Sequence, residues 1–234
     1  MAITKLTQFR RTTQAGVTLI EMLVVVAIIA VISSVIMFNY SDFSSNVSVR
    51  NLSQEIALAI RKGQTYATSV RSVDGTSIED SSAYAGYGVS FSTNETATDP
   101  YLATSRRFVL FVDIPEGGGS GAYAGTYSQT SGQACGDPTS SSNECVESFS
   151  ITTADKIVAI CGGDVEGYSS EPATCTGTGA VDISFKRPSP DARIVYTDEN
   201  GVTTRSTYAQ IILESAKGLK RGITVWNTGQ ISVQ

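Results

Sequence analysis

The sequence has no histidine among its 234 residues. This absence excludes Ser-His-Asp and Cys-His nucleophile pairs, histidine general bases and every zinc site that needs an imidazole ligand. Charged residues are also scarce, at 17% of the chain, and the 17 basic residues are outnumbered by 22 acidic ones. The net charge of -5 argues against a general nucleic-acid-binding surface, which would carry a basic excess. We therefore expect no catalytic residue, no metal and no cofactor.

Proline and glycine are missing between Val17 and Lys62, and this stretch holds a long apolar run. Residues 22–32 read MLVVVAIIAVI, and 35–38 extend the run past two serines. As a helix, residues 17–38 would span roughly 33 Å, which matches a bilayer core of about 30 Å. No later segment is comparably apolar, so the sequence predicts one membrane span.

The residues before this run form a basic leader, 1–16, with Lys5, Arg10 and Arg11 and no acidic residue. The positive-inside rule predicts that the leader is cytoplasmic and that everything after the helix is exported. An ordinary secretory signal places its apolar region before the cleavage site. Here the small pair Ala15-Gly16 precedes the apolar run, which is the reverse order.

Glu21 interrupts the apolar pattern. A charged side chain at the centre of a membrane helix costs about 2.5 to 3.5 kcal/mol, and less near the interface. One interpretation is a carboxylate close enough to the membrane edge to reach solvent. The other is that cleavage after Gly16 creates an α-amino group on Val17, and that this amine pairs with Glu21 of a neighbouring subunit in low dielectric.

Residues 15–30, AGVTLIEMLVVVAIIA, resemble the class III signal of type IV prepilins and type II secretion pseudopilins. The resemblance implies that a prepilin peptidase cuts between Gly16 and Val17, that the new amino group of Val17 is methylated, and that Glu21 serves subunit assembly. It also implies an inner-membrane assembly platform and a motor ATPase as partners.

The helix is expected to continue beyond the membrane. Apolar residues recur at steps of three and four between Val49 and Val70, which predicts an amphipathic helix to about residue 72. We expect four parts: the leader 1–16, a transmembrane and assembly helix 17–40, its amphipathic continuation 41–72, and an exported β-rich head 73–234. The expected fold is α+β and pilin-like, with the long helix packed on an antiparallel sheet.

Short runs rich in β-branched and aromatic residues predict the strands of the head. The candidates are 87–92, 108–113, 156–160, 181–185, 193–196, 208–214, 223–226 and 230–233. Asn200-Gly201 is a favourable hairpin turn, and residues 227–229 join the last two strands. The Gly-, Ser- and Thr-rich stretch 116–148 is predicted to be a flexible loop.

All four cysteines fall in the exported part, where disulfides form. Sequence alone leaves three connectivities. We favour Cys135 with Cys145 and Cys161 with Cys175, because both pairs close short loops worth about 2 to 3 kcal/mol each. A zinc site is the rival, and it is disfavoured because the sequence has no C-x2-C pair.

The distal sequence, from ISFKRPSPDARI to RGITVWNTGQISVQ, is similar to the closing strands of the GspH/FimT pseudopilin family. Some members of that group take up DNA through basic residues near the C-terminus, and Lys217, Lys220 and Arg221 form a small basic cluster here. A solvated loop before the last hairpin is the simpler interpretation of that cluster. Paired carboxylates, drawn from Asp182, Asp191, Asp198 and Glu199, are similarly expected to be turn residues.

The sequence thus predicts a structural subunit of a type IV pilus or type II secretion pseudopilus. It would polymerise with other pilin or pseudopilin subunits after leaving membrane lipid. We expect a single-pass membrane protein that becomes part of an extracellular or periplasmic filament. The alternatives are a DNA-binding or adhesive minor or tip pilin, and a membrane-tethered extracellular enzyme.

Overall fold

The computed structural model describes residues 16–69, 86–94, 99, 101–114, 124–130, 133–136, 138, 142–186 and 188–234, without the side chain of residue 39. The chain divides into two compact units, Met1–Phe43 and Ser44–Gln234. Most of the expected leader, 1–15, lies outside the described residues.

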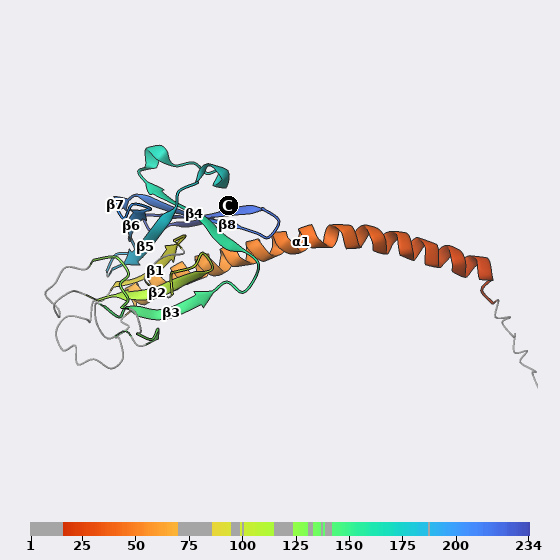
Figure 1. The fold of residues 1–234 in the computed structure, drawn as a ribbon, viewed down its shortest axis with the longest axis horizontal. Coiled ribbons are helices and arrows are strands. Elements are labelled where there is room, and N and C mark those ends of the chain that lie inside the picture. The colour runs from red at the N-terminus through yellow and green to blue at the C-terminus, as the bar shows by residue number, and fades with distance from the viewer. Residues whose placement is uncertain are drawn as a thin grey trace, which may run out of the picture. The chain divides into compact units, whose positions relative to one another are not determined.

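A single long helix, α1 (Leu19–Thr68), runs through the boundary between the units (Figure 1). It begins two residues later than the sequence suggests, and it ends at Thr68, where Ser69 closes a turn by donating its N–H to the carbonyl of Thr65 (2.8 Å). The predicted end near residue 72 lies outside the described residues. The Ser- and Asn-rich stretch 39–46 is helical, which agrees with the absence of helix-breaking residues there.

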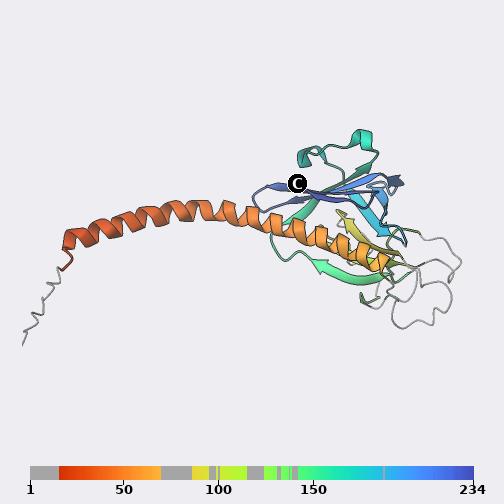
Figure 2. The same cartoon turned by 180° about the vertical axis from the view of Figure 1, so that it is seen from behind.

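In the described part of the second unit, ten strands form two antiparallel sheets (Figures 1 and 2). The first sheet has the order β3-β2-β1-β5-β6-β7 and the second the order β10-β9-β8-β4. The strand bounds are β1 Gly86–Ser92, β2 Arg107–Asp113, β3 Cys145–Ser150, β4 Lys156–Gly163, β5 Gly179–Phe185, β6 Ala192–Asp198, β7 Thr203–Ser206, β8 Tyr208–Glu214, β9 Lys220–Trp226 and β10 Ile231–Val233. Two short 3-10 helices, η2 (Val165–Gly167) and η3 (Pro172–Thr174), follow β4.

The expected α+β, pilin-like architecture is confirmed: one long N-terminal helix is packed on antiparallel sheets. All eight predicted strands are present, with ends shifted by a few residues. Asn200-Gly201 lies in the turn between β6 and β7, where Gly201 has the positive φ of +80° that favours glycine.

The prediction that 116–148 is one loop was wrong at its C-terminal end. Residues 145–148 belong to β3, and Gln129 forms an isolated bridge with Asn143. The strand escaped prediction because it is an edge strand with a register shift opposite Leu110 and Phe111, and its exposed positions are polar. Residues 115–123 lie outside the described part of the chain.

The core of the second unit lies where α1 meets the sheets. From residue 44 onward, one face of α1 is buried: Val49, Leu52, Ile56, Ala59, Ile60 and Ala67. These side chains share one cluster with residues of both sheets, among them Val89 of β1 and Ile211 of β8. The expected amphipathic half of the helix is therefore present, and its apolar stripe stabilises the unit by removing these side chains from water.

Candidate assembly segment

The first turn of α1 is built around Thr18 and Glu21. The backbone N–H of Glu21 donates to the side-chain oxygen of Thr18 (3.3 Å), and the N–H of Met22 donates to the Thr18 carbonyl (3.2 Å). A threonine three residues before a glutamate is the pattern of a capping box, and an acidic group in the first turn also complements the helix dipole. Glu21 therefore has a local role at the start of the helix that our sequence analysis missed, although the pattern Thr-x-x-Glu could have indicated it.

Gly16 and Val17 precede this cap and lie outside any helix or strand. The side chain of Val17 is 64% exposed, and apart from Gly16 and its chain neighbours no atom of the described residues lies within 4 Å of the position that a Cβ on Gly16 would occupy. The predicted cleavage point is thus a non-helical peptide bond immediately before the helix cap.

The helix that follows exposes a long apolar surface. From Leu19 to Phe38 every large apolar side chain is exposed, with exposed fractions between 45% for Val25 and 84% for Leu19. The chain has one helix long and apolar enough to cross a membrane within the described residues, and none of its most apolar 18-residue window is buried. A surface of this size needs lipid or other subunits to cover it.

A sequence-family model described as the prokaryotic N-terminal methylation motif matches residues 11–37. The N-terminus carries a type IV prepilin signature. The match includes Gly16, Val17 and Glu21, and it covers only the N-terminal segment of the chain. It implies processing and assembly with other pilin-like subunits, and the apolar helix fits a single-pass membrane-anchored protein. No curated protein and no solved structure matches the chain.

Two disulfides fix segments of the head. Cys135 is joined to Cys145 at the start of β3, and Cys161 of β4 to Cys175, with Cα–Cα distances of 4.8 and 5.9 Å. These are the pairs that the spacing favours. The second disulfide holds the segment containing η2 and η3 against β4.

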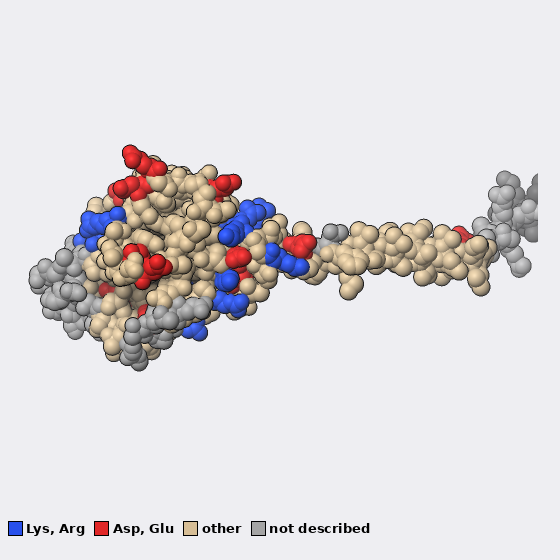
Figure 3. Space-filling model, turned by 45° about the horizontal axis from the view of Figure 1, so that its top comes forward, with Lys and Arg blue, Asp and Glu red and all other residues tan. Residues whose placement is uncertain are grey.

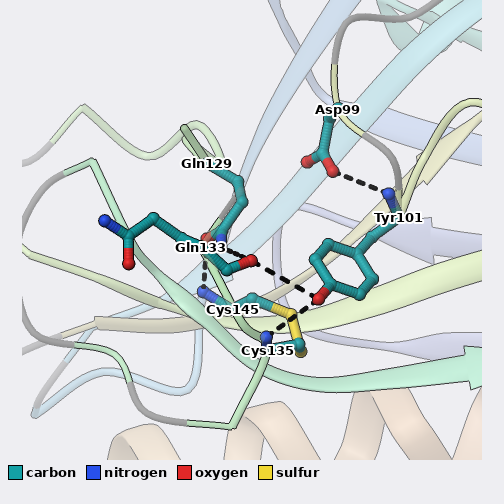
Figure 4. Close-up of a disulfide and its surroundings, with 6 residues drawn as sticks. All are labelled: Asp99, Tyr101, Gln129, Gln133, Cys135 and Cys145. Carbon is teal, nitrogen blue, oxygen red and sulfur yellow. Dashed lines mark hydrogen bonds between the residues drawn. A yellow bond between two sulfur atoms is a disulfide. The ribbon is translucent and has the colours of Figure 1, made fainter. Parts of the chain in front are cut away.

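The first disulfide lies in a polar network around Tyr101 (Figure 4). The Tyr101 hydroxyl accepts the N–H of Cys135 (3.0 Å) and donates to the carbonyl of Gln133 (3.4 Å). The Gln129 side chain accepts the N–H of Cys145 (3.3 Å), and Asp99 accepts the N–H of Tyr101 (2.7 Å). The network satisfies backbone groups of the irregular segment that precedes β3.

Three buried carboxyl groups lie on the first sheet or next to it: Asp113 ends β2, Asp182 is in β5, and Glu144 directly precedes β3. Burial raises the pKa of Glu144 to about 8 and that of Asp182 to about 7, and it also raises the pKa of Asp113. Glu144 nevertheless accepts two backbone hydrogen bonds, from Ile114 (2.9 Å) and Ser128 (2.8 Å). Among the described residues no cluster of acidic, Cys or His side chains has the geometry of a metal site.

The carboxylates considered as paired acids are not brought together as one site. Asp182 is 7% exposed on β5, so the expectation of a solvated turn residue was wrong for this position. The sequence did not predict this burial, because it depends on a contact between Asp182 and the backbone of Tyr127, in the segment before β3, which is distant in sequence. Asp198 does stabilise a turn, since its carboxylate accepts the N–H groups of Asn200 (2.9 Å) and Val202 (2.8 Å). Asp191 is exposed.

The basic cluster spans the connection between β8 and β9. Lys217 lies in the turn, whereas Lys220 and Arg221 are the first two residues of β9. The prediction of a solvated loop is therefore correct for Lys217 and wrong for Lys220 and Arg221. β9 begins earlier than predicted because Lys220 pairs with Glu214, and Arg221 with Leu213, across the hairpin.

Proposed function

We propose that this protein is a structural subunit of a type IV pilus or type II secretion pseudopilus, and that it acts mechanically rather than as an enzyme. The single observation that carries the proposal is the exposed apolar surface of α1 between Leu19 and Phe38, nearly all of which lies within the match to the prokaryotic N-terminal methylation motif. Within that superfamily we place the chain nearest to the GspH/FimT minor pseudopilins, because of the sequence of its closing strands β8, β9 and β10.

The subunit is held in the bilayer after a prepilin peptidase has cut between Gly16 and Val17. It then leaves the membrane by packing its apolar helix surface against the same surface of neighbouring subunits. The exchange of lipid for protein is nearly neutral in hydrophobic terms, because lipid tails are as apolar as the side chains. Register must therefore come from a polar contact, and a motor ATPase at the assembly platform supplies the work.

Glu21 provides that polar contact. The α-amino group of Val17, which remains cationic after methylation, pairs with the Glu21 carboxylate of an adjacent subunit in low dielectric. The hydrogen bond of the Thr18 cap uses the backbone N–H of Glu21 and does not involve its carboxylate. A buried charge pair that loses one partner costs about 3 to 5 kcal/mol, which is large enough to select one register.

The test compares Glu21→Ala with Asp42→Ala, which removes an exposed acid of the same helix outside the apolar surface. Both variants are expected to insert into the membrane. Glu21→Ala should reduce the sheared filament fraction by about tenfold or more, given the size of the lost interaction. Asp42→Ala should assemble normally. Normal assembly of Glu21→Ala would contradict the proposed role of Glu21.

A further inference from the structure

Three strands of the second unit begin with a basic residue. β2 starts at Arg107, β4 at Lys156 and β9 at Lys220. Lys156 and Lys220 lie on either side of the same residue, Glu214 at the end of β8, in the register of the second sheet. Two of these strand starts therefore flank the end of β8.

Hydrogen bonds bring the third strand start to the same end of the unit. The N–H of Ile157 donates to the carbonyl of Ser105 (2.8 Å), and that of Ile151 donates to the carbonyl of Arg106 (2.8 Å). These bonds join the start of β2, in one sheet, to the segment that leads into β4, in the other. The basic strand starts of both sheets thus share one edge of the unit.

This edge is where α1 enters the unit. The hydroxyl of Ser48 donates to the buried carboxylate of Asp155, one residue before β4. At the other end of the unit, Gln64 donates to the carbonyl of Pro190 (3.0 Å) and lies 3.4 Å from the carbonyl of Gly229, in the turn after β9. The sixteen residues of helix between Ser48 and Gln64 correspond to about 24 Å, so the basic edge and the turn after β9 are at opposite ends.

We call this basic edge the proximal rim. It consists of Arg50, Arg106, Arg107, Lys156, Lys217, Lys220 and Arg221. Figure 3 shows blue side chains gathered at the end of the head where α1 enters. Glu55, Glu214 and the buried Asp155 lie on the same segments as these basic residues. The described residues from 44 onward include twelve basic and fourteen acidic ones, so seven of the twelve basic residues belong to the rim.

The position of the rim in the chain indicates what faces it. Ser44, the first residue of the second unit, follows Phe38, the last residue of the apolar surface, by six residues, and a chain of this length reaches at most about 20 Å. Tyr40 and Phe43 lie in this connection with exposed fractions of 67% and 69%, and aromatic residues favour the headgroup level of a bilayer. Asp42 is the one acid of the connection.

We propose that the proximal rim docks the head on anionic phospholipid headgroups of the membrane that holds α1. This inference rests on the proposed function, in which α1 is anchored in a bilayer before assembly. Each Lys or Arg near an anionic surface contributes roughly a fivefold gain in binding. Docking would hold unassembled subunits in a common orientation, and assembly would have to release them.

The rim includes Lys217, Lys220 and Arg221, the cluster considered above for DNA binding. Five residues, 39–43, separate the apolar surface, which ends at Phe38, from the unit that carries the rim, which begins at Ser44. This short tether keeps the rim within reach of lipid headgroups in an anchored subunit, whereas a duplex would have to be supplied from solution. The tether therefore favours lipid, and binding of DNA is an alternative outcome of the test.

Lysine footprinting of the full chain in nanodiscs tests the proposal. Acylation rates at Lys156, Lys217 and Lys220 are measured by mass spectrometry in zwitterionic phosphatidylcholine discs and in discs containing phosphatidylglycerol, with Lys186 outside the rim as internal reference. We expect acylation of the three rim lysines to slow by about threefold or more in the anionic discs. The protection should disappear in 0.5 M NaCl, where the Debye length is about 4 Å, and Lys186 should not change.

Matched variants separate the rim from net charge. Arg50→Gln with Arg106→Gln removes two exposed rim charges and leaves the lysine reporters in place, and it should lower the protection. Arg61→Gln with Arg205→Gln removes two exposed charges elsewhere and should leave it unchanged. Thermal unfolding of each variant verifies that the fold is intact, so that loss of protection reports on charge.

Three outcomes would overturn the proposal. Equal acylation rates in both kinds of disc, with the chain inserted, would refute the rim–lipid contact and leave the proposed function untouched. Protection by a 20-base-pair duplex at 150 mM salt, without protection by phosphatidylglycerol, would assign the rim to DNA. A chain that fails to insert into either disc would refute the anchored subunit itself, and this inference with it.

Discussion

Glu21 donates its backbone N–H to the hydroxyl oxygen of Thr18 at 3.3 Å, so the charged residue of the apolar segment is also the third residue of a capped helix. Glu21 follows Val17, the residue that becomes the amino terminus after the proposed cleavage, by four residues. A capping role alone would make Glu21 important for helix formation, whereas a pairing role makes its charge important for assembly. The two roles can be separated at Thr18.

Thr18→Ala should weaken the start of α1 by about 1 kcal/mol, because alanine cannot accept the Glu21 N–H. Faster amide exchange of residues 19–22 in detergent would record this loss, and Thr18→Ser should restore protection. Because the carboxylate of Glu21 is retained, filament assembly of Thr18→Ala should fall far less than that of Glu21→Ala. Equal assembly defects in the two variants would mean that Glu21 acts through the helix cap.

The head should lose stability as the pH rises from about 4 to 8. Burial raises the pKa of Asp182 to about 7 and that of Glu144 to about 8, so the folded state binds more protons than the unfolded state between their ordinary pKa values and these raised ones. The unfolding free energy then falls with pH, by up to about 1.4 kcal/mol per pH unit for each proton.

Asp182→Asn should flatten the lower part of this profile, up to about pH 7, because asparagine does not titrate. Denaturant unfolding of the full chain in detergent at pH 5, 6, 7 and 8 measures the effect. Asp191→Asn, an exposed position, serves as the control and should keep the wild-type slope. An unfolding free energy that rises across this pH range in the wild type would show that these carboxyl groups are ionised in the folded head.

Removal of either disulfide should destabilise the head to a similar extent. The loops closed by Cys135–Cys145 and Cys161–Cys175 span 10 and 14 residues, which corresponds to about 3 kcal/mol each in the loop-entropy account. Each pair has one buried cysteine, Cys145 or Cys175, where a serine adds the cost of a buried hydroxyl. Denaturant unfolding of the two double serine variants measures the losses, and a variant as stable as the wild type would contradict a stabilising role for its disulfide.

Substitution by alanine should have opposite effects on stability at two glycines of the helix–sheet contact. A Cβ on Gly88 of β1 would lie 2.5 Å from the carbonyl of Ile183 and 2.7 Å from the ring of Phe111, so Gly88→Ala should destabilise the head by about 1 to 3 kcal/mol. A Cβ on Gly63 of α1 would make ordinary contacts at 3.5 Å with Leu110, and alanine favours helix by up to about 1 kcal/mol. Thermal unfolding of both variants checks the contrast; a tolerated Gly88→Ala would mean that the strands pack less closely there.

The sequence predicted the elements whose signals are local. The apolar run, the i, i+3, i+4 stripe of α1 and eight strands with β-branched and aromatic residues were all correctly expected. β3 and β7 were missed, because edge strands with polar exposed faces lack an apolar alternation.

Long-range relationships were beyond sequence reasoning. The burial of Asp182 depends on packing between segments far apart in the chain, and the proximal rim is assembled from α1 and from strand starts of two sheets. No local pattern around Arg106, Lys156 or Lys220 indicates that they share an edge. From the sequence, Lys217, Lys220 and Arg221 form an isolated basic cluster. The fold adds Arg106, Arg107 and Lys156 to the same edge, which the sequence does not indicate.

The most direct test of the account is intact mass spectrometry of the protein isolated from the membranes and filaments of its native host. We predict a mature chain that begins at Val17 with one added methyl group on its amino terminus, in both fractions. A chain that still carries residues 1–16 and occurs in no filament would contradict the proposed processing and assembly.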